Sequence, residues 1–328
     1  MAAGLLALLA VWGDVHPREL LQALKRLPRS TYLVAAGVHV AVYLLRALRF
    51  RVLLPAAQRP ALPLMAAVSA AHNLAAYVLP AKTGELSLVV YLKTVCGVPA
   101  GTGLAALIVG RMLDIASFGL ALCIVAVWLS LARPDVVPDW LFAAALAPGL
   151  LAVLALLCAV RGEWFVRLLA RMAHATGLER WDFTRRMIER ARGLAHALEQ
   201  TSRGGQLGLA MLLALLMWLG VFTFFALLAR GFGLGPSIGP LEAAFGASMA
   251  MFTNVLPINA LAGFGTQETG WVLGFGLLGV PRDLALSSGV AVHLVQLFNT
   301  LILGMLGHVG MGLLSGAART EAGHPPVE

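Results

Sequence analysis

The stretch Leu79-Pro80-Ala81-Lys82-Thr83-Gly84-Glu85 interrupts an apolar run that extends from residue 62 to residue 98. The apolar pieces on either side, 62–79 and 86–98, are shorter than the roughly 20 residues with which a helix crosses a hydrocarbon core. Proline ends a helical run and glycine favours a turn. The pattern therefore predicts two short helices joined by a break, a broken or re-entrant pair.

A second interruption of the same kind lies near the other end of the chain. Short apolar pieces at 241–256 and 271–280 flank the segment 257–268, which begins with proline and ends in Gly263-Phe264-Gly265-Thr266-Gln267-Glu268. The chain thus contains one unit twice: a full span, a helix broken after Leu-Pro, a return marked by an acidic residue, and another full span. An asparagine precedes each break: Asn73 and Asn254.

The composition of the chain also indicates a membrane protein. Of the 328 residues, 59% are hydrophobic and 12% are charged, whereas soluble globular chains carry about a quarter charged residues. No period-2 alternation of the barrel kind is present, so helices must satisfy the backbone in the bilayer. We predict an all-α, polytopic transmembrane helix bundle with about six full spans plus two hairpins. The expected spans lie at 1–12, 31–54, 103–131, 140–160, 206–230 and 284–314.

The chain divides into two membrane halves. Residues 1–160 form the first, with the hairpin 62–98, and residues 205–316 the second, with the hairpin 240–280. Between them, 161–204 holds nine arginines against five acids, which predicts amphipathic helices on the cytoplasmic face. A polar tail, 317–328, follows. With the connector inside, both termini are cytoplasmic and the two units are inverted repeats, as in secondary transporters. Four basic residues then lie on the outer side of the membrane, although basic residues usually concentrate on the cytoplasmic side: Arg18, Lys25, Arg26 and Arg29.

The net charge of +8 does not indicate nucleic acid, because the basic residues sit at the ends of apolar blocks and in the connector. That placement favours anionic lipid headgroups. The three cysteines, Cys96, Cys123 and Cys158, stand singly in apolar surroundings, so neither a disulfide nor a zinc site is indicated. No nucleotide or metal motif is present, and we expect no cofactor.

Ionisable residues inside spans are costly, so each is a candidate for function. Lys82 and Glu85 lie at the first break and either face a polar cavity or form a salt bridge that seals the turn. Glu268, beside Gln267, either faces the same cavity or stabilises the first turn of the returning helix. The remaining polar residues in apolar runs are explained most simply by hydrogen bonds between helices: His39, His72, His293, Gln296 and Asn299.

Arg111 and Asp114 stand at i and i+3 in a long span, so they share a helix face. They either neutralise each other or leave Arg111 to bind phosphate from within the bundle.

Four motifs carry a resemblance to the lysylphosphatidylglycerol synthase/flippase transmembrane family. They are Arg46-Ala47-Leu48-Arg49-Phe50-Arg51, which closes the second span, the stretch from Leu79 to Glu85, Arg111-Met112-Leu113-Asp114, and the stretch from Gly263 to Glu268. Their order and spacing together are fairly specific, and the match covers nearly the whole chain. Two positions depart from the family's frequent arginine: Leu88 and Gln267.

This resemblance implies a flippase-like protein of the bacterial cytoplasmic membrane, in which two inverted re-entrant hairpins enclose a central cavity. Relatives without a synthase domain are associated with glycolipid, polyprenyl-phosphate or hopanoid pathways. The two departures remove cavity cations and weaken the expectation of a strongly anionic substrate. The residues that we expect to bind substrate are Arg49, Asn73, Lys82, Glu85, Arg111, Asp114, Asn254, Gln267 and Glu268.

We therefore expect a lipid translocase that is not an enzyme, with membrane lipids as its partners. Residues after 314 leave no room for a catalytic domain, so aminoacyl transfer by this polypeptide alone is not expected. Two alternatives stay open. One is a membrane-embedded enzyme acting on lipid-linked sugars or phosphates, with Glu85 or Glu268 as general base. The other is a scaffold that docks a lipid-modifying enzyme through the segment 161–204.

Overall fold

A computed structural model describes residues 25, 27–132, 161–176, 205–234, 238–255 and 261–322, and isolated positions between 146 and 199. Every regular element in this part is helical, which confirms the all-α class. The helices are α3 (Arg29–Leu53), α4 (Leu62–Val78), α5 (Ser87–Cys96), α6 (Ala100–Ala132), α8 (Gly162–Ala175), α10 (Gly205–Gly231), α11 (Pro240–Val255), α12 (Thr266–Leu277) and α13 (Arg282–Ala322). Short 3-10 turns form η1 (Ala56–Gln58), η2 (Pro80–Leu86) and η4 (Leu261–Gly263).

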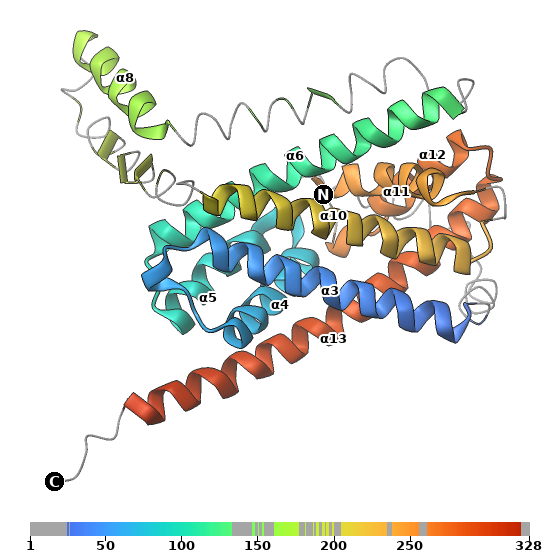
Figure 1. Ribbon diagram of the computed structural model, residues 1–328, viewed down its shortest axis with the longest axis horizontal. Helices are drawn as coiled ribbons and strands as arrows, with labels where there is room; N and C mark the ends of the chain where they lie inside the picture. Colours follow the sequence, from blue (N-terminus) through green and yellow to red (C-terminus); the bar gives the residue numbers. More distant parts are fainter. Residues whose placement is uncertain are drawn as a thin grey trace.

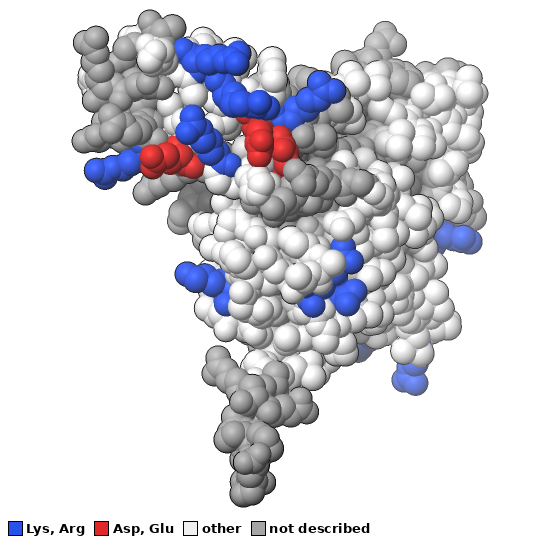
Figure 2. Space-filling view, turned by 60° about the vertical axis from the view of Figure 1, so that its left-hand side comes forward, with Lys and Arg blue, Asp and Glu red and all other residues white. Residues whose placement is uncertain are grey.

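Four of these helices are long and apolar enough to cross a membrane: α3, α6, α10 and the first 34 residues of α13. They correspond to four of the six expected spans. The other two, 1–12 and 140–160, lie outside the described residues. Figure 2 shows a broad, nearly uncharged surface, with most charged side chains gathered at one end. The chain is an integral membrane protein.

The two halves interlock instead of lying apart (Figure 1). Helix α3 packs along α10 in antiparallel fashion: a Cβ on Gly220 would lie 2.7 Å from Val42, and one on Gly231 would lie 3.1 Å from Thr31. Across the bundle, α13 of the second half packs antiparallel on α4 of the first, where Gly304 meets Leu74. Small residues let the helix backbones approach closely.

Each half also contains a broken helix pair. In the first half, η2 separates α4 from α5, as the Leu-Pro signal predicts, and the His72 ring and the Ser87 hydroxyl join the two helices at 2.9 Å. In the second, α11 and α12 are so close that a Cβ on Gly274 would lie 2.1 Å from the Gly246 carbonyl oxygen. Pro257 lies outside the described residues.

The connector contains α8, whose buried residues Val166, Ala170 and Ala173 recur at helical spacing. This agrees with the expected amphipathic helix. In Figure 1, α8 stands apart from the bundle at one corner.

Candidate functional site

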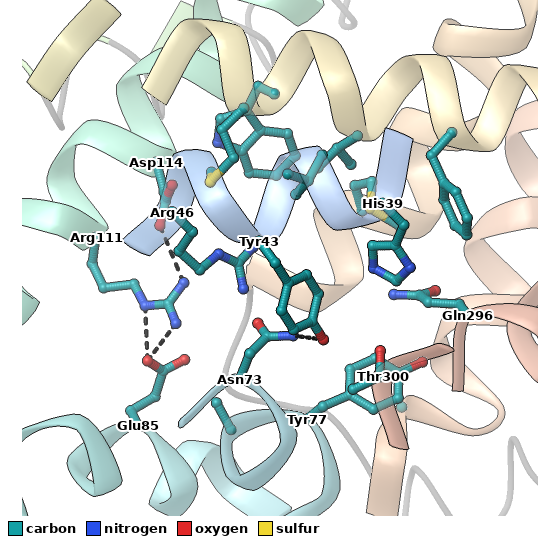
Figure 3. A pocket seen from close by; sticks show the side chains of 18 of the residues that line it. His39, Tyr43, Arg46, Asn73, Tyr77, Glu85, Arg111, Asp114, Gln296 and Thr300 are labelled. Atoms are coloured by element: carbon teal, nitrogen blue, oxygen red, sulfur yellow. Dashed lines mark hydrogen bonds and ion pairs between the residues drawn. The ribbon is translucent and has the colours of Figure 1, made fainter. Parts of the chain in front are cut away.

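A cavity of about 600 Å³ lies where the two halves meet, within the size range of small-molecule sites. Helices α3, α4, α6, α10, α11 and α13 contribute to its wall, as do η2 and η4. Figure 3 shows charged side chains at one end and neutral polar side chains at the other. The site therefore depends on both halves of the chain.

The charged end is an ion-pair network centred on Asp114. The Arg49 guanidinium donates to both carboxylate oxygens of Asp114, one at 3.1 Å and the other closer. Arg111, which lies on α6 together with Asp114, donates to Asp114 Oδ2 at 3.2 Å. Arg111 also donates through Nε to Glu85 Oε2 at 2.8 Å and through Nη2 to the same oxygen. The network thus ties α3, α6 and the first break together.

Exposure changes steadily across this network. The side chain of Arg49 is 1% exposed and that of Asp114 8%, whereas Glu85 is 16% and Arg111 40% exposed. Arg49 does not belong to the cavity wall, so it supports Asp114 from behind. Arg111 and Glu85 therefore stand at the accessible edge of the site.

Arg46 adds a charge that the network does not neutralise. It lines the cavity one turn before Arg49, and it has no ion pair with any residue that the structure describes. Its Nε atom is buried without a hydrogen-bond partner. Three arginines, Arg46, Arg49 and Arg111, meet two carboxylates here, so the described side chains of this end carry one net positive charge. Such a site attracts an anion.

The opposite end is polar but holds no formal charge among the residues described. Tyr43 and Asn73 are joined by a hydrogen bond from the Asn73 amide to the phenol oxygen at 2.5 Å. The Trp218 and Phe224 rings of α10 form a neighbouring apolar wall. In Figure 3, the remaining polar side chains at this end come from three helices: His39, Tyr77, Gln296 and Thr300.

The second break is closed. Glu268 is fully buried, accepts a hydrogen bond from the Gly265 N–H at 2.8 Å and contacts His293 Nδ1 at 2.5 Å. The other nitrogen of His293 lies 3.0 Å from the Ala262 carbonyl oxygen, so it donates to that oxygen. Ala262 itself has a φ of 51°, an uncommon conformation for a residue with a side chain. Every polar group of this small cluster is satisfied within the fold.

The structure brings together some of the residues expected to bind substrate and separates others. Asn73, Glu85, Arg111 and Asp114 line one cavity. Glu268 does not, and Gln267 is buried with its amide donating to Gln296 at 2.8 Å. The side chains of two expected residues lie outside the described part of the chain: Lys82 and Asn254.

Three further positions of the sequence motifs lie inside the bundle: Leu88, Arg46 and Arg49. Leu88, which replaces a frequent arginine of the family, is fully buried in the apolar core of the first half and not in the cavity wall. Arg46 was expected to close the span at the membrane edge, but it lies inside the bundle and lines the cavity. Arg49, expected to bind substrate, is not part of the cavity wall and is bound to Asp114. Arg51 and Arg59, by contrast, do lie at the end of α3 and donate to backbone carbonyl oxygens.

The position of Arg46 in the sequence already indicates that it belongs to the helix interior and not to its end. Tyr43, Arg46 and Arg49 follow each other at three-residue spacing and so share one face of α3, and the first two lie well before its end. Charges that merely flank a span would follow the last apolar turn. Among the described residues, no three histidine, cysteine or acidic side chains come together as metal ligands.

One family of proteins is similar to this chain over most of its length. The family model described as the lysylphosphatidylglycerol synthase TM region matches residues 1–304. No curated protein matches the chain.

Proposed function

Since the chain belongs to the lysylphosphatidylglycerol synthase transmembrane-region family, we propose that it moves an amphipathic membrane lipid between the two leaflets of the bilayer. The family links it to lipid modification or transport. In this proposal the membrane is the bacterial cytoplasmic membrane and both termini are cytoplasmic. The lipid headgroup occupies the cavity while its acyl or polyprenyl chains stay among the surrounding lipids.

The observation that carries the proposal is a cavity with one net positive charge inside an otherwise apolar bundle. Charged residues at this depth cost several kcal/mol unless they are paired or hydrated. Arg46 has no ion pair in the described part of the chain, which leaves its guanidinium available to an anionic ligand. An anionic headgroup supplies the missing counter-charge.

The path of the first half supports a re-entrant hairpin. Arg49 is four residues before the end of α3, whereas Asp114 is fourteen residues into α6, and these two side chains are paired. Gly110 of α6 lies beside Phe50 of α3, and Phe118 of α6 lies beside Phe222 of α10, whose neighbour Gly220 faces Val42 of α3, so α6 runs antiparallel to α3. The chain therefore leaves α3 and enters α6 on the same side of this pair. Between them, α4 has 17 residues and α5 has 10, both short of a full crossing. A hairpin that enters and returns on one side accounts for these lengths.

The order of elements supports inverted repeats. Each half has a long helix, a short helix, a 3-10 turn, a second short helix and a long helix. The first long helices of the two halves, α3 and α10, run antiparallel, as an inverted pair requires. In transporters built this way, one repeat rocks against the other around a fixed central site.

Leaflet exchange in reconstituted vesicles tests the proposal. Vesicles with and without the purified chain are loaded with fluorescent phospholipid, glycolipid or polyprenyl phosphate, and the fraction reached by an external quencher is followed in time. We expect faster exchange with protein, reduced in Arg111→Gln and unchanged in the control Arg167→Gln on α8. Exchange no faster than in protein-free vesicles for every lipid class would refute it.

The enzyme alternative finds less support in the geometry. A general base needs a carboxylate that is free to take a proton from substrate. Glu85 accepts two hydrogen bonds from Arg111, and both oxygens of Glu268 are engaged. Product formed by the purified chain, and lost in Glu85→Gln, would favour the enzyme.

A further inference from the structure

We propose that the cavity selects a lipid whose headgroup joins a phosphodiester to a neutral, hydroxyl-bearing group, and that it rejects headgroups with an amine. This inference rests on the proposed function and names the substrate class of the same cavity. Two observations support it: the difference in charge between the two ends of the site, and the polar atoms for which the described fold supplies no hydrogen-bond partner.

The phosphate position follows from Arg46. The other arginines of the charged end are already bound to carboxylates: Arg49 to Asp114, and Arg111 to Asp114 and Glu85. Among the described arginines of this end, Arg46 alone has no ion pair. Arginine binds phosphate through charge-assisted hydrogen bonds in a planar fork. A phosphodiester with its single negative charge neutralises the one net positive charge of this end.

The second position lies farther along the same face of α3. His39 is seven residues before Arg46, two helical turns or about 10 Å away, and Tyr43 lies between them. This length accommodates a phosphate joined to one sugar-sized or inositol-sized group. The side chains here are neutral donors and acceptors beside the Phe224 ring, which stands 4.5 Å from the His39 ring. Hydroxyl groups fit such surroundings because they both donate and accept.

Polar atoms without partners gather round this cavity. In the part of the chain that the structure describes, eight buried side-chain nitrogen or oxygen atoms lack a hydrogen bond. Four of them belong to cavity-lining residues: His39, Arg46, Tyr77 and Trp218. Buried polar groups are normally satisfied, and each exception needs an explanation. A ligand rich in acceptors gives these groups their partners when it is bound.

The same geometry disfavours an aminoacyl or ethanolamine headgroup. An ammonium group needs a free carboxylate or a carbonyl cage, and the far end has no acidic residue among its described lining. Glu85 and Asp114 lie at the other end and are engaged by arginine. A cation would also stand close to Arg46 and Arg111. The cavity therefore discriminates against the lysyl headgroup after which the family is named.

Lipid binding to the purified chain in detergent tests this selectivity, by native mass spectrometry with acyl-matched lipids. The probes are phosphatidylinositol, phosphatidic acid, phosphatidylethanolamine, lysylphosphatidylglycerol and glucosyl diacylglycerol. We expect phosphatidylinositol to bind about tenfold or more tightly than the two amine lipids and the phosphate-free glycolipid. Phosphatidic acid should fall between.

Two variants locate the two parts of the headgroup. Arg46→Gln should weaken all lipids with phosphate by about tenfold and leave the glycolipid unchanged. Tyr77→Phe should weaken phosphatidylinositol by about threefold and leave phosphatidic acid unchanged. Because neither group has a partner in the described fold, both variants should keep the thermal stability of the empty protein. Arg167→Gln on α8 serves as the control.

The outcomes separate this inference from the proposed function. Equal binding of amine and inositol lipids, or an unchanged order of affinities in Arg46→Gln, would overturn the headgroup assignment. Leaflet exchange without headgroup preference would do the same while leaving transport intact. Selective binding with no leaflet exchange would support the assignment and count against transport.

Discussion

The two helix breaks of this protein carry an acidic residue each, yet the two carboxylates differ in exposure and in their hydrogen-bond partners. Glu85 at the first break is 16% exposed, lines the cavity and bonds an arginine that is itself 40% exposed. Glu268 at the second break is fully buried and bonded to a backbone N–H and to His293. The same local pattern thus lines a cavity in one half and stabilises a helix start in the other.

This difference shows that the role of an acidic residue at a helix break depends on the residues that contact it in the fold. Glu85 meets Arg111 at the surface of a cavity, where both side chains are partly exposed. Glu268 meets His293 inside packed helices, where leaving a polar group unpaired costs more than in a hydrated site. Mutations in the two halves should therefore separate loss of folding from loss of transport.

The largest effect should come from Asp114→Asn, which removes the charge that holds Arg49. Breaking a buried ion pair typically costs about 3–5 kcal/mol, because the remaining charge stays buried. We expect a strongly lowered unfolding temperature in detergent, or failure to accumulate in the membrane. The double variant Arg49→Met with Asp114→Leu should recover much of the loss, and no recovery would contradict the ion-pair explanation.

The next effect tests the rigidity of the second hairpin. In Gly274→Ala the added methyl group would lie 2.1 Å from the Gly246 carbonyl oxygen, so α11 and α12 must separate. Overpacking of this kind costs about 1–3 kcal/mol. The matched control is Gly276→Ala, two residues away, whose Cβ meets nothing within 4 Å. Thermal unfolding of the two variants should differ clearly, and equal stability would mean that the helices are less tightly packed.

Glu268→Gln should have a moderate effect on folding. The glutamine amide keeps one acceptor, so either the Gly265 N–H or His293 loses its partner, at about 1–3 kcal/mol. Leaflet exchange, normalised to folded protein, should stay close to wild type. If exchange is abolished while the variant remains folded, the second break takes part in transport directly and the contrast between the halves disappears.

The smallest effect on stability should come from Glu85→Gln. Its partner Arg111 is 40% exposed, so water can replace the lost contact at a cost of about 1 kcal/mol or less. Transport should nevertheless fall, because Arg111 is no longer held in place at the accessible edge. The charge-swapped pair Glu85→Arg with Arg111→Glu should restore stability, and a full recovery of exchange would show that only the pairing matters.

Much of the fold was predictable from local pattern. Apolar length gave four spans that the structure contains, and the Leu-Pro signal gave the first break at Pro80. The i, i+3 spacing of Arg111 and Asp114 predicted a shared helix face, and the ion pair that was one of the two alternatives forms. These features depend on residues that are close in sequence.

The rest depends on distant partners. Of the two roles expected for Glu268, the structure shows the second, because its carboxylate accepts a hydrogen bond from the Gly265 N–H at the start of α12. His293, 25 residues later in the chain, encloses it. Arg49 and Asp114 are 65 residues apart, and nothing in either segment identifies the other. Arg46 was assigned to the membrane edge because basic residues usually end a span there. Its position inside the cavity becomes clear only when α6 is placed against α3.

The seam between α13 and α4 also limits how the molecule can move. On α13, Gly304 and Gly307 present bare backbone to α4, where a Cβ would come within 2.3 Å of Leu74 and 2.7 Å of the Ala67 carbonyl oxygen. The Leu74 side chain is seated on Gly304, so sliding of α13 along α4 would drive this side chain against the neighbouring, larger residues of α13. Separation would forfeit the close van der Waals contact of the two helices. The seam therefore holds α4 and α13 in one register.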